Sequence, residues 1–152
     1  MATIYLLDTN ILVHLVRGDK TGQRIKLSHA PALAIPRPLV SIVTEGELRS
    51  LALQFRWGKT KVDQALFYLS YFQRVSIDQE AIFSAYAALD AYSVSIGRNP
   101  GKNDLWIAAT AHVMGACILT TDRDFDHLAR RFLAVECIPT DSDEMAAPAD
   151  AV

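Results

Sequence analysis

The sequence predicts an α/β domain with a central, mostly parallel sheet. Short apolar segments alternate along the chain with longer segments whose apolar residues recur at helical spacing, as with Ala85, Leu89, Tyr92 and Ile96 at i, i+4, i+7 and i+11. Strands that alternate with helices pair in parallel, because each helix returns the chain to the edge where the next strand begins. With 152 residues and 51% hydrophobic content, the chain has enough apolar material for one buried core.

The first strand is predicted at residues 3–7, a short apolar segment. Asp8 directly after it suits the N-terminus of a helix, and Gly18 suits its end. Three prolines between residues 31 and 38 mark an irregular connection to the next apolar segment, residues 39–43. The sequence therefore predicts strand, helix, loop and strand in this order.

Two helices follow, at about residues 44–55 and 61–72, with a break at Gly58. Residues 74–77 are the next strand candidate. The periodic segment described above then forms an amphipathic helix, which Gly97 ends.

In the last third of the chain, Asn103 is predicted to cap a helix that runs to about Met114. Residues 116–120 are a strand, residues 124–130 a short helix and residues 133–138 the last strand. From Pro139 onward, acidic residues are scattered among Ala, Ser and Pro without an apolar period. We therefore expect one domain, residues 1–138, followed by a flexible acidic tail, residues 139–152.

Composition excludes several classes of protein. With 15 basic and 17 acidic residues the net charge is 15 − 17 = −2, which argues against a general nucleic-acid coat protein. Cys117 and Cys137 are too far apart for a C-x-x-C site and indicate a reducing, cytoplasmic setting. The N-terminus lacks the features of a signal peptide, and the longest uncharged stretch, residues 105–121, is shorter than the roughly 20 residues of a membrane span.

Four acidic residues are predicted to meet at one edge of the sheet. Asp8 directly follows the first predicted strand, and Asp122 follows the strand at residues 116–120. Glu47 and Asp104 lie in the first turns of predicted helices that start at the same edge. Carboxylates gathered without an obligatory Lys or Arg repel one another unless they take up protons or a cation neutralises them. All-oxygen ligands favour Mg²⁺ or Mn²⁺ over Zn²⁺.

Each acid also has a local structural interpretation. Asp8 suits a helix cap, Glu47 completes a capping box with Thr44, Asp104 favours the dipole of its helix, and Asp122 suits a turn. Four independent caps at one edge of a sheet would be a coincidence, so we favour a joint metal site.

Four segments of the chain resemble the ordered motifs of PIN-domain ribonucleases, and most of all those of VapC-type toxins from prokaryotic toxin–antitoxin pairs. They are residues 6–12 (LLDTNIL), 41–48 (SIVTEGEL), 103–109 (NDLWIAA) and 119–125 (LTTDRDF). The resemblance spans about residues 3–138. It implies a three-layer α/β/α PIN fold, Mg²⁺- or Mn²⁺-dependent cleavage of RNA, and a cognate antitoxin that blocks the site.

Carried over by position, the resemblance makes Asp8, Glu47, Asp104 and Asp122 the catalytic, metal-binding acids. Glu47 is preferred to Glu45 because the acid of the motif directly precedes Leu48. The last motif leaves a choice open, since Asp124 and Asp126 offer further carboxylates, and the number of metal ions is open as well.

Further residues are expected to support such a site. The side chains suited to hydrogen-bond its carboxylates or waters are those of Thr9, Asn10, Thr44 and Thr120. The candidates for RNA phosphate contacts are Arg98, Lys102 and Arg123. The apolar segment 65–72 shows two apolar helical faces, which together with the resemblance predicts a homodimer.

The function that these observations favour is hydrolysis of RNA phosphodiesters by metal-activated water, in the toxin of a type II toxin–antitoxin pair. The alternatives are a PIN nuclease of RNA maturation or decay outside such a pair, and a catalytically silent PIN-like binding module. A phosphoryl-accepting Asp8 is a third reading, but haloacid-dehalogenase-like phosphatases carry a second Asp where this chain has Asn10.

Overall fold

The structure is a computed structural model and describes residues 2–140. From residue 141 on, the predicted acidic tail lies outside the described residues. The strands are β1 (Tyr5–Leu7), β2 (Leu39–Ser41), β3 (Gln73–Val75), β4 (Cys117–Thr120) and β5 (Ala134–Cys137). The helices are α1 (Thr9–Arg17), α2 (Lys20–Ser28), α3 (Ile42–Gln54), α4 (Lys59–Tyr71), α5 (Glu80–Ser95) and α6 (Lys102–Met114).

The five strands form one parallel sheet in the order β3-β2-β1-β4-β5. In the centre of the sheet, Leu6 pairs with Leu39 of β2 on one side and with Ile118 of β4 on the other. All five strands therefore end at the same edge, which confirms the predicted parallel α/β architecture.

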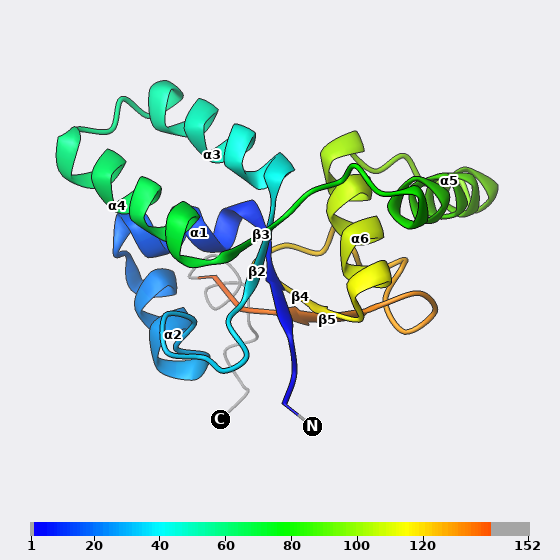
Figure 1. Cartoon of the computed structure of the whole chain (residues 1–152), viewed down its shortest axis with the longest axis horizontal. Helices are drawn as coiled ribbons and strands as arrows, with labels where there is room; N and C mark the ends of the chain where they lie inside the picture. Colours follow the sequence, from blue (N-terminus) through cyan, green and yellow to red (C-terminus); the bar gives the residue numbers. More distant parts are fainter. Residues whose placement is uncertain (1, 141–152) are drawn as a thin grey trace, which may run out of the picture.

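Helices cover both faces of the sheet, as the three-layer prediction requires. Figure 1 shows α1 to α4 on one side of the strands and α5 with α6 on the other. Neighbouring strand residues point to opposite faces. Leu6 accordingly packs in the core beneath α5 and α6, and Leu7 in the core beneath α1 and α4. None of the helices in the described part of the chain is long and apolar enough to cross a membrane.

Helix α1 begins and ends as predicted. The carboxylate of Asp8 accepts a hydrogen bond from the backbone N–H of Thr9, and Gly18 ends the helix in the left-handed conformation (φ 64°). Ile11, Leu12 and Leu15 bury the inner face of the helix. The cap places Asp8 at the carboxyl edge of the sheet, where β1 ends.

Helix α2 was not predicted. It is a polar helix in which Thr21, Gly22 and Ile25 are the buried residues, so the sequence lacks the apolar period that marks an amphipathic helix. Its N-terminus is instead held by Asp19, which accepts a hydrogen bond from the N–H of Gly22 at 2.8 Å.

Two other predictions were wrong. The N-cap of α6 is Gly101, not Asn103, so Asn103 lies inside the helix while Asp104 stays in the first turn. Residues 124–130 form successive turns, not a helix. The carboxylate of Asp122 accepts a hydrogen bond from the backbone N–H of Asp124 at 3.0 Å, which forms a turn instead of a first helical turn. Arg130 has a positive φ of 69°, which a right-handed helix does not allow.

We predict that Gly22→Ala destabilises the protein by about 1–3 kcal/mol, because overpacking a close contact forces the backbone to shift. A Cβ atom at Gly22 would lie 2.2 Å from the backbone oxygen of His14 in α1. Urea unfolding measures the change in the free energy of unfolding.

The matched control is Gly46→Ala in α3, where a Cβ atom meets nothing within 4 Å. This variant should be more stable than the parent by about 0.5–1 kcal/mol, since alanine loses less backbone entropy in a helix. Equal stabilities of the two variants would contradict the close α1–α2 packing.

Candidate metal site

The four predicted acids line one hollow at the carboxyl edge of the sheet. The hollow has a volume of about 310 Å³, and Asp8, Glu47, Asp104 and Asp122 all contribute to its wall. They come from four parts of the fold: the β1–α1 junction, α3, the first turn of α6 and the segment after β4. Glu47 is one turn deeper in its helix than predicted, because α3 starts at Ile42.

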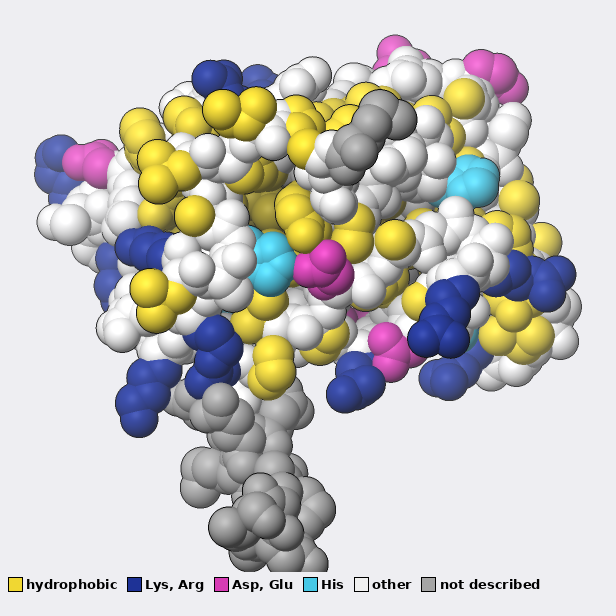
Figure 2. Space-filling model, turned by 90° about the horizontal axis from the view of Figure 1, so that it is seen from below, with side chains coloured by type: hydrophobic (Ala, Val, Ile, Leu, Met, Phe, Trp, Pro, Cys, Tyr) yellow, Lys and Arg dark blue, Asp and Glu magenta, His cyan; other side chains and the backbone are white. Residues whose placement is uncertain are grey.

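The opposite end of the molecule lacks such a cluster on the surface that Figure 2 displays. This view is taken from the side of the N-terminus, where the strands begin, and its acidic side chains are scattered rather than gathered. The acids at the carboxyl edge are therefore a local feature of that edge.

Asp8 is the most buried of the four acids, with 4% of its surface exposed. One carboxylate oxygen accepts from the N–H of Thr9 and the other from the hydroxyl of Thr120, both at 2.8 Å. Burial nevertheless raises the pKa of Asp8 to about 7, and the negative charges of Asp122 and Asp104 raise it further against the hydrogen bond from Thr120. The anionic form of Asp8 is therefore disfavoured in the folded protein without metal.

Two threonines hold Glu47 in place. The hydroxyl of Thr9 donates to Oε1 of Glu47 at 2.7 Å, and its oxygen lies 3.0 Å from the hydroxyl of Thr44. Because the proton of Thr9 goes to Glu47, Thr44 is the donor in the second contact. Thr44 is fully buried, so this chain of hydroxyls ties α3 to the start of α1.

Asn10 and Thr120 hold Asp122. The Asn10 amide donates to Oδ2 of Asp122 at 2.9 Å, and its carbonyl oxygen accepts from the N–H of Thr121 at 3.2 Å. The N–H of Asp122 donates to the hydroxyl oxygen of Thr120 at 3.2 Å. All four supporting residues predicted from the sequence therefore contact an acid of the hollow or the network behind it.

Asp104 has no such anchor among the contacts within residues 2–140, and its charge is opposed by its neighbours. Burial raises its pKa to about 6, with further contributions from the negative charges of Asp124, Asp122 and Glu47. Burial likewise raises the pKa of Asp122. Three carboxyl groups of one hollow are thus destabilised as anions.

The donor set fits a hard divalent cation. The four carboxylates offer oxygen ligands only. Burial first, and then neighbouring negative charge, raises the pKa values of Asp8, Asp104 and Asp122. Within residues 2–140, however, no three His, Cys, Asp or Glu side chains are arranged closely enough to hold a metal by themselves.

Two other candidate acids are separated from this hollow. Glu45 forms ion pairs with Arg74 at 2.8 Å and with Arg49 at 3.1 Å. Asp126 lies 3.5 Å from Arg123. The preference for Glu47 over Glu45 in the sequence analysis therefore agrees with where the two side chains lie.

A second polar hollow adjoins the first and shares Asp104 with it. It measures about 240 Å³, and Arg98, Arg123, Asp124 and His127 are among its lining residues. Two of the three predicted phosphate-binding cations, Arg98 and Arg123, line this hollow. The third, Lys102, instead lies 3.5 Å from Asp90 of α5.

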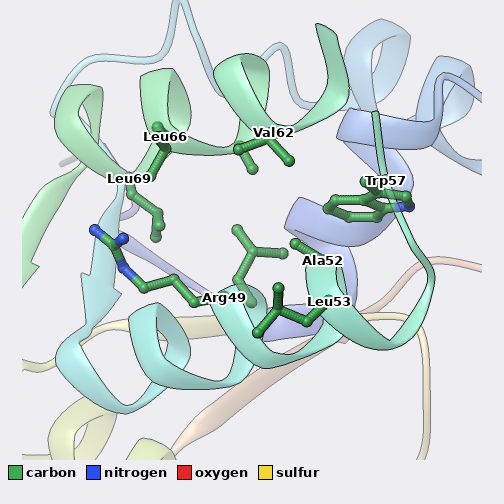
Figure 3. A pocket seen from close by; sticks show the side chains of 9 residues that line it. Arg49, Ala52, Leu53, Trp57, Val62, Leu66 and Leu69 are labelled. Atoms are coloured by element: carbon green, nitrogen blue, oxygen red, sulfur yellow. The ribbon is translucent and has the colours of Figure 1, made fainter. Parts of the chain in front are cut away.

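An apolar groove of about 290 Å³ lies between α3 and α4. Figure 3 shows its side chains directed into the space between the two helices, with Leu53 and Ala52 on one side and Val62 and Leu66 on the other. Leu53 is 81% exposed and Leu66 40%. Such an exposed apolar groove is typical of a surface that binds another protein.

The sequence analysis missed some residues of the acidic hollow. His14, Arg17, Leu51 and Phe55 also line it. His14 is bonded through Nδ1 to Asp19 at 2.8 Å, an interaction across the α1–α2 junction. No local motif marks these residues, because they reach the hollow only when the ends of α1 and α3 come together.

The chain is similar to known proteins along most of its length. The sequence profile of the PIN domain matches residues 5–131. Ribonuclease VapC4 of Mycobacterium tuberculosis is 38% identical over 88 residues, which cover 57% of this chain and 67% of that protein.

Solved structures share the fold. VapBC-5 of M. tuberculosis, a member of the VapBC family of toxin–antitoxin systems, is 25% identical with a TM-score of 0.63, covering 91% of this chain and 100% of that one. VapBC2 of Rickettsia felis, bound to a DNA fragment of its promoter, is 22% identical with a TM-score of 0.72, covering 89% of this chain and 98% of that one. At 22% identity, the similarity to VapBC2 shows a shared fold only.

We predict that the stability of Asp8→Asn relative to the parent, measured without metal, rises by about 1–3 kcal/mol between pH 4 and pH 8. The folded-state pKa of Asp8, about 7, exceeds the ordinary aspartate value of 3.8 that applies in the unfolded chain. The folded parent therefore binds more protons than the unfolded chain in this window, and its free energy of unfolding falls as pH rises. Asparagine does not titrate and still suits a helix N-cap.

Urea unfolding in EDTA at several pH values measures this difference. Groups that do not interact with Asp8 contribute equally to the two proteins and cancel in the comparison. Asp104 and Asp122 act on Asp8, so the measured difference includes the change in their coupling to it. A relative stability independent of pH would mean that Asp8 is not destabilised as an anion.

Proposed function

The chain belongs to the PIN domain family, and on this premise we propose that it is a divalent-metal-dependent ribonuclease, the toxin of a VapBC-type toxin–antitoxin pair. The observation that carries the proposal is the acidic hollow. Asp8, Glu47, Asp104 and Asp122 line one cavity although they are far apart in sequence. The raised pKa values of the three aspartates show that their anionic forms are disfavoured in the hollow, and a bound cation would stabilise them.

In this proposal Asp8, Glu47, Asp104 and Asp122 hold one or two Mg²⁺ or Mn²⁺ ions, with Asp124 as a further candidate at the border with the second hollow. When bound, such an ion lowers the pKa of a coordinated water, polarises a phosphoryl oxygen and stabilises the leaving alkoxide. The protein supplies position and charge. Thr120 fixes Asp8, Thr9 fixes Glu47 and Asn10 fixes Asp122, which limits the reorganisation needed around the substrate.

No covalent nucleophile is needed for this reaction. Among the described residues that line the acidic hollow there is no serine or cysteine. The histidine there, His14, is engaged by Asp19. Hydrolysis by water, with the carboxylates as the anchoring groups, is therefore the reaction that this set of side chains supports.

The second hollow supports a polyanionic substrate. Arg98 and Arg123 bring positive charge beside Asp104 without occupying the acidic hollow, so they suit RNA phosphates next to the one that is cleaved. Lys102 does not line this hollow and is a weaker candidate for such a contact. Cleavage of RNA would place the protein in the cytoplasm.

The toxin assignment is supported by the likeness to Ribonuclease VapC4 and to the VapBC-5 toxin–antitoxin structure. A cationic side chain of an antitoxin would pair with the uncompensated carboxylates, and its apolar residues would fit the groove between α3 and α4. Helix α3 contributes to both surfaces, with Glu47 lining the hollow and Leu48 lining the groove. A partner that binds along this helix would contact both.

We propose a homodimer as well. On α4, Ala65, Tyr68 and Leu69 bury one face, while Phe67 remains 56% exposed on the other. Phe67 also stacks on Tyr71, with 5.9 Å between ring centroids, which extends an aromatic surface along the helix. A second subunit would cover this surface.

We predict that Asp8→Asn and Asp104→Asn lower kcat/KM for RNA cleavage by at least about 100-fold, because a metal ion contributes several kcal/mol to the transition state. Total RNA incubated with Mg²⁺ or Mn²⁺, followed by mapping of new ends, identifies a target for kinetics. Titration calorimetry should show that both variants bind Mn²⁺ more weakly than the parent.

Glu45→Gln is the control for this experiment, because Glu45 carries the same charge in the same helix but pairs with Arg74 and Arg49. It should cleave RNA and bind Mn²⁺ like the parent. If both aspartate variants bind Mn²⁺ like the parent, the proposal of a metal site is wrong, and the acids have only local structural roles such as capping helices.

We predict that a small protein encoded next to this chain inhibits the cleavage and co-purifies with it. Replacement of the cleft-facing Arg or Lys of that protein by Ala should weaken inhibition, and Leu66→Glu in the groove should weaken the complex without reducing RNA cleavage. Inhibition that survives the loss of the cationic side chain would rule out charge pairing with the carboxylates.

A further inference from the structure

A cation and an aromatic ring lie together on the wall of the acidic hollow, outside the set of proposed metal ligands. The guanidinium carbon of Arg17 is 4.5 Å from the centroid of the Phe55 ring, and both residues line the hollow together with the four acids. Phe55 is 43% exposed, and Arg17 is exposed as well. We refer to this pair as the Arg17–Phe55 ledge.

The ledge is carried by rigid elements. Arg17 is the last residue of α1, and Gly18 ends the helix directly after it. Phe55 is the C-cap residue of α3, where its N–H donates to the carbonyl of Leu51 at 2.8 Å. The two helix ends meet beside the acids, so the ring and the guanidinium have defined positions relative to Asp8 and Glu47.

The charge of Arg17 is available to a ligand. Within residues 2–140 Arg17 forms no ion pair within 4 Å. Asp19 is bonded to His14 at 2.8 Å and to the N–H of Gly22 at 2.8 Å, and the charge of Arg17 acts on it only as the last of several influences that lower its pKa. A stabilising charge at the end of α1 requires only a cation, and a lysine would supply it. Stabilising the end of α1 does not explain why the planar guanidinium lies over the ring of Phe55.

We propose that the Arg17–Phe55 ledge stacks an unpaired nucleobase of the RNA substrate, next to the phosphate held at the acids; this inference rests on the proposed ribonuclease function. Guanidinium planes and aromatic rings both stack on nucleobases, and the positive charge favours a ligand that carries phosphates. A base in a duplex is covered by its neighbours, so the ledge selects single-stranded RNA.

The ledge also indicates the path of the strand. It belongs to α1 and α3 on one side of the sheet, whereas the hollow with Arg98 and Arg123 lies at the start of α6 and the loop after β4 (Figure 1). The acids lie between these two surfaces, because Asp104 lines both hollows. RNA would therefore cross the acids with a stacked base on one side and phosphates on arginines on the other.

The test measures binding apart from cleavage. Fluorescence anisotropy gives the Kd of a labelled ten-nucleotide oligouridylate in Ca²⁺, with gel electrophoresis confirming that the oligomer stays intact. Phe55→Leu, which keeps an apolar side chain without the ring, should raise the Kd about 5- to 100-fold, the range expected for one stacked base. Phe55→Tyr should bind like the parent, and Arg17→Lys, which keeps the charge at the end of α1, should bind more weakly.

An oligomer of the same length with abasic riboses is the control for stacking. The parent should bind it as weakly as Phe55→Leu binds the complete oligomer, and Phe55→Leu should not distinguish the two. In Mg²⁺ the ledge variants should raise KM for single-stranded RNA while kcat stays within about threefold, because stacking acts on substrate binding. Circular dichroism and thermal melts establish that the variants are folded.

If the parent cleaves RNA and Phe55→Leu has the same Kd and KM as the parent, the stacking proposal is wrong and the proposed ribonuclease function stands. A Phe55→Leu variant that binds RNA normally and loses affinity only for the antitoxin would assign the ledge to that partner and also overturn the proposal. If the parent binds but never cleaves RNA, and Phe55→Leu binds more weakly, the ledge stands and the hydrolytic function fails. A parent that neither binds nor cleaves RNA overturns both.

Discussion

Because β1 and β4 pair in parallel with Leu7 opposite Leu119, both strands deliver the chain to the same point of the sheet edge. The N–H of Asp8 still donates to the carbonyl of Leu119 at 2.9 Å, so the strand pairing reaches into the first acidic position. Asp122 follows β4 and is bonded to Asn10, two residues beyond Asp8. The proximity of the acids thus follows from backbone hydrogen bonding, and an antiparallel pairing of the same strands would place them at opposite edges.

The hydrogen bonds around the acids are made by neutral groups. Thr9, Thr44, Asn10 and Thr120 orient the carboxylates without neutralising them, whereas Glu45, outside the hollow, has two arginine partners. The hollow therefore keeps its negative charge for an external cation while its geometry is maintained by the protein. The buried carboxylates at this edge destabilise the folded state electrostatically. The two apolar cores on either side of the sheet offset this cost.

The sequence predicted best those residues that both mark the end of a strand or helix and have a role in the folded structure. Asp8 and Asp122 could be placed because they follow apolar strands, and Gly18 could be placed as a helix end because it suits the left-handed conformation. Helix α2 escaped prediction because its stability depends on the Asp19 cap and on contact with α1, neither of which leaves an apolar period. Arg17 and Phe55 carry no motif at all, and they meet only through the packing of α1 and α3.

Asp8 serves two purposes, as the cap of α1 and as part of the acidic hollow, and these purposes tolerate different substitutions. Asparagine fulfils the first as well as aspartate does but lacks the negative charge required for the second. A single base change in the codon converts one into the other. In a population of cells, a gene of this kind can therefore be silenced while its product still folds and still presents the groove between α3 and α4, so that an inactive copy would continue to sequester the partner protein.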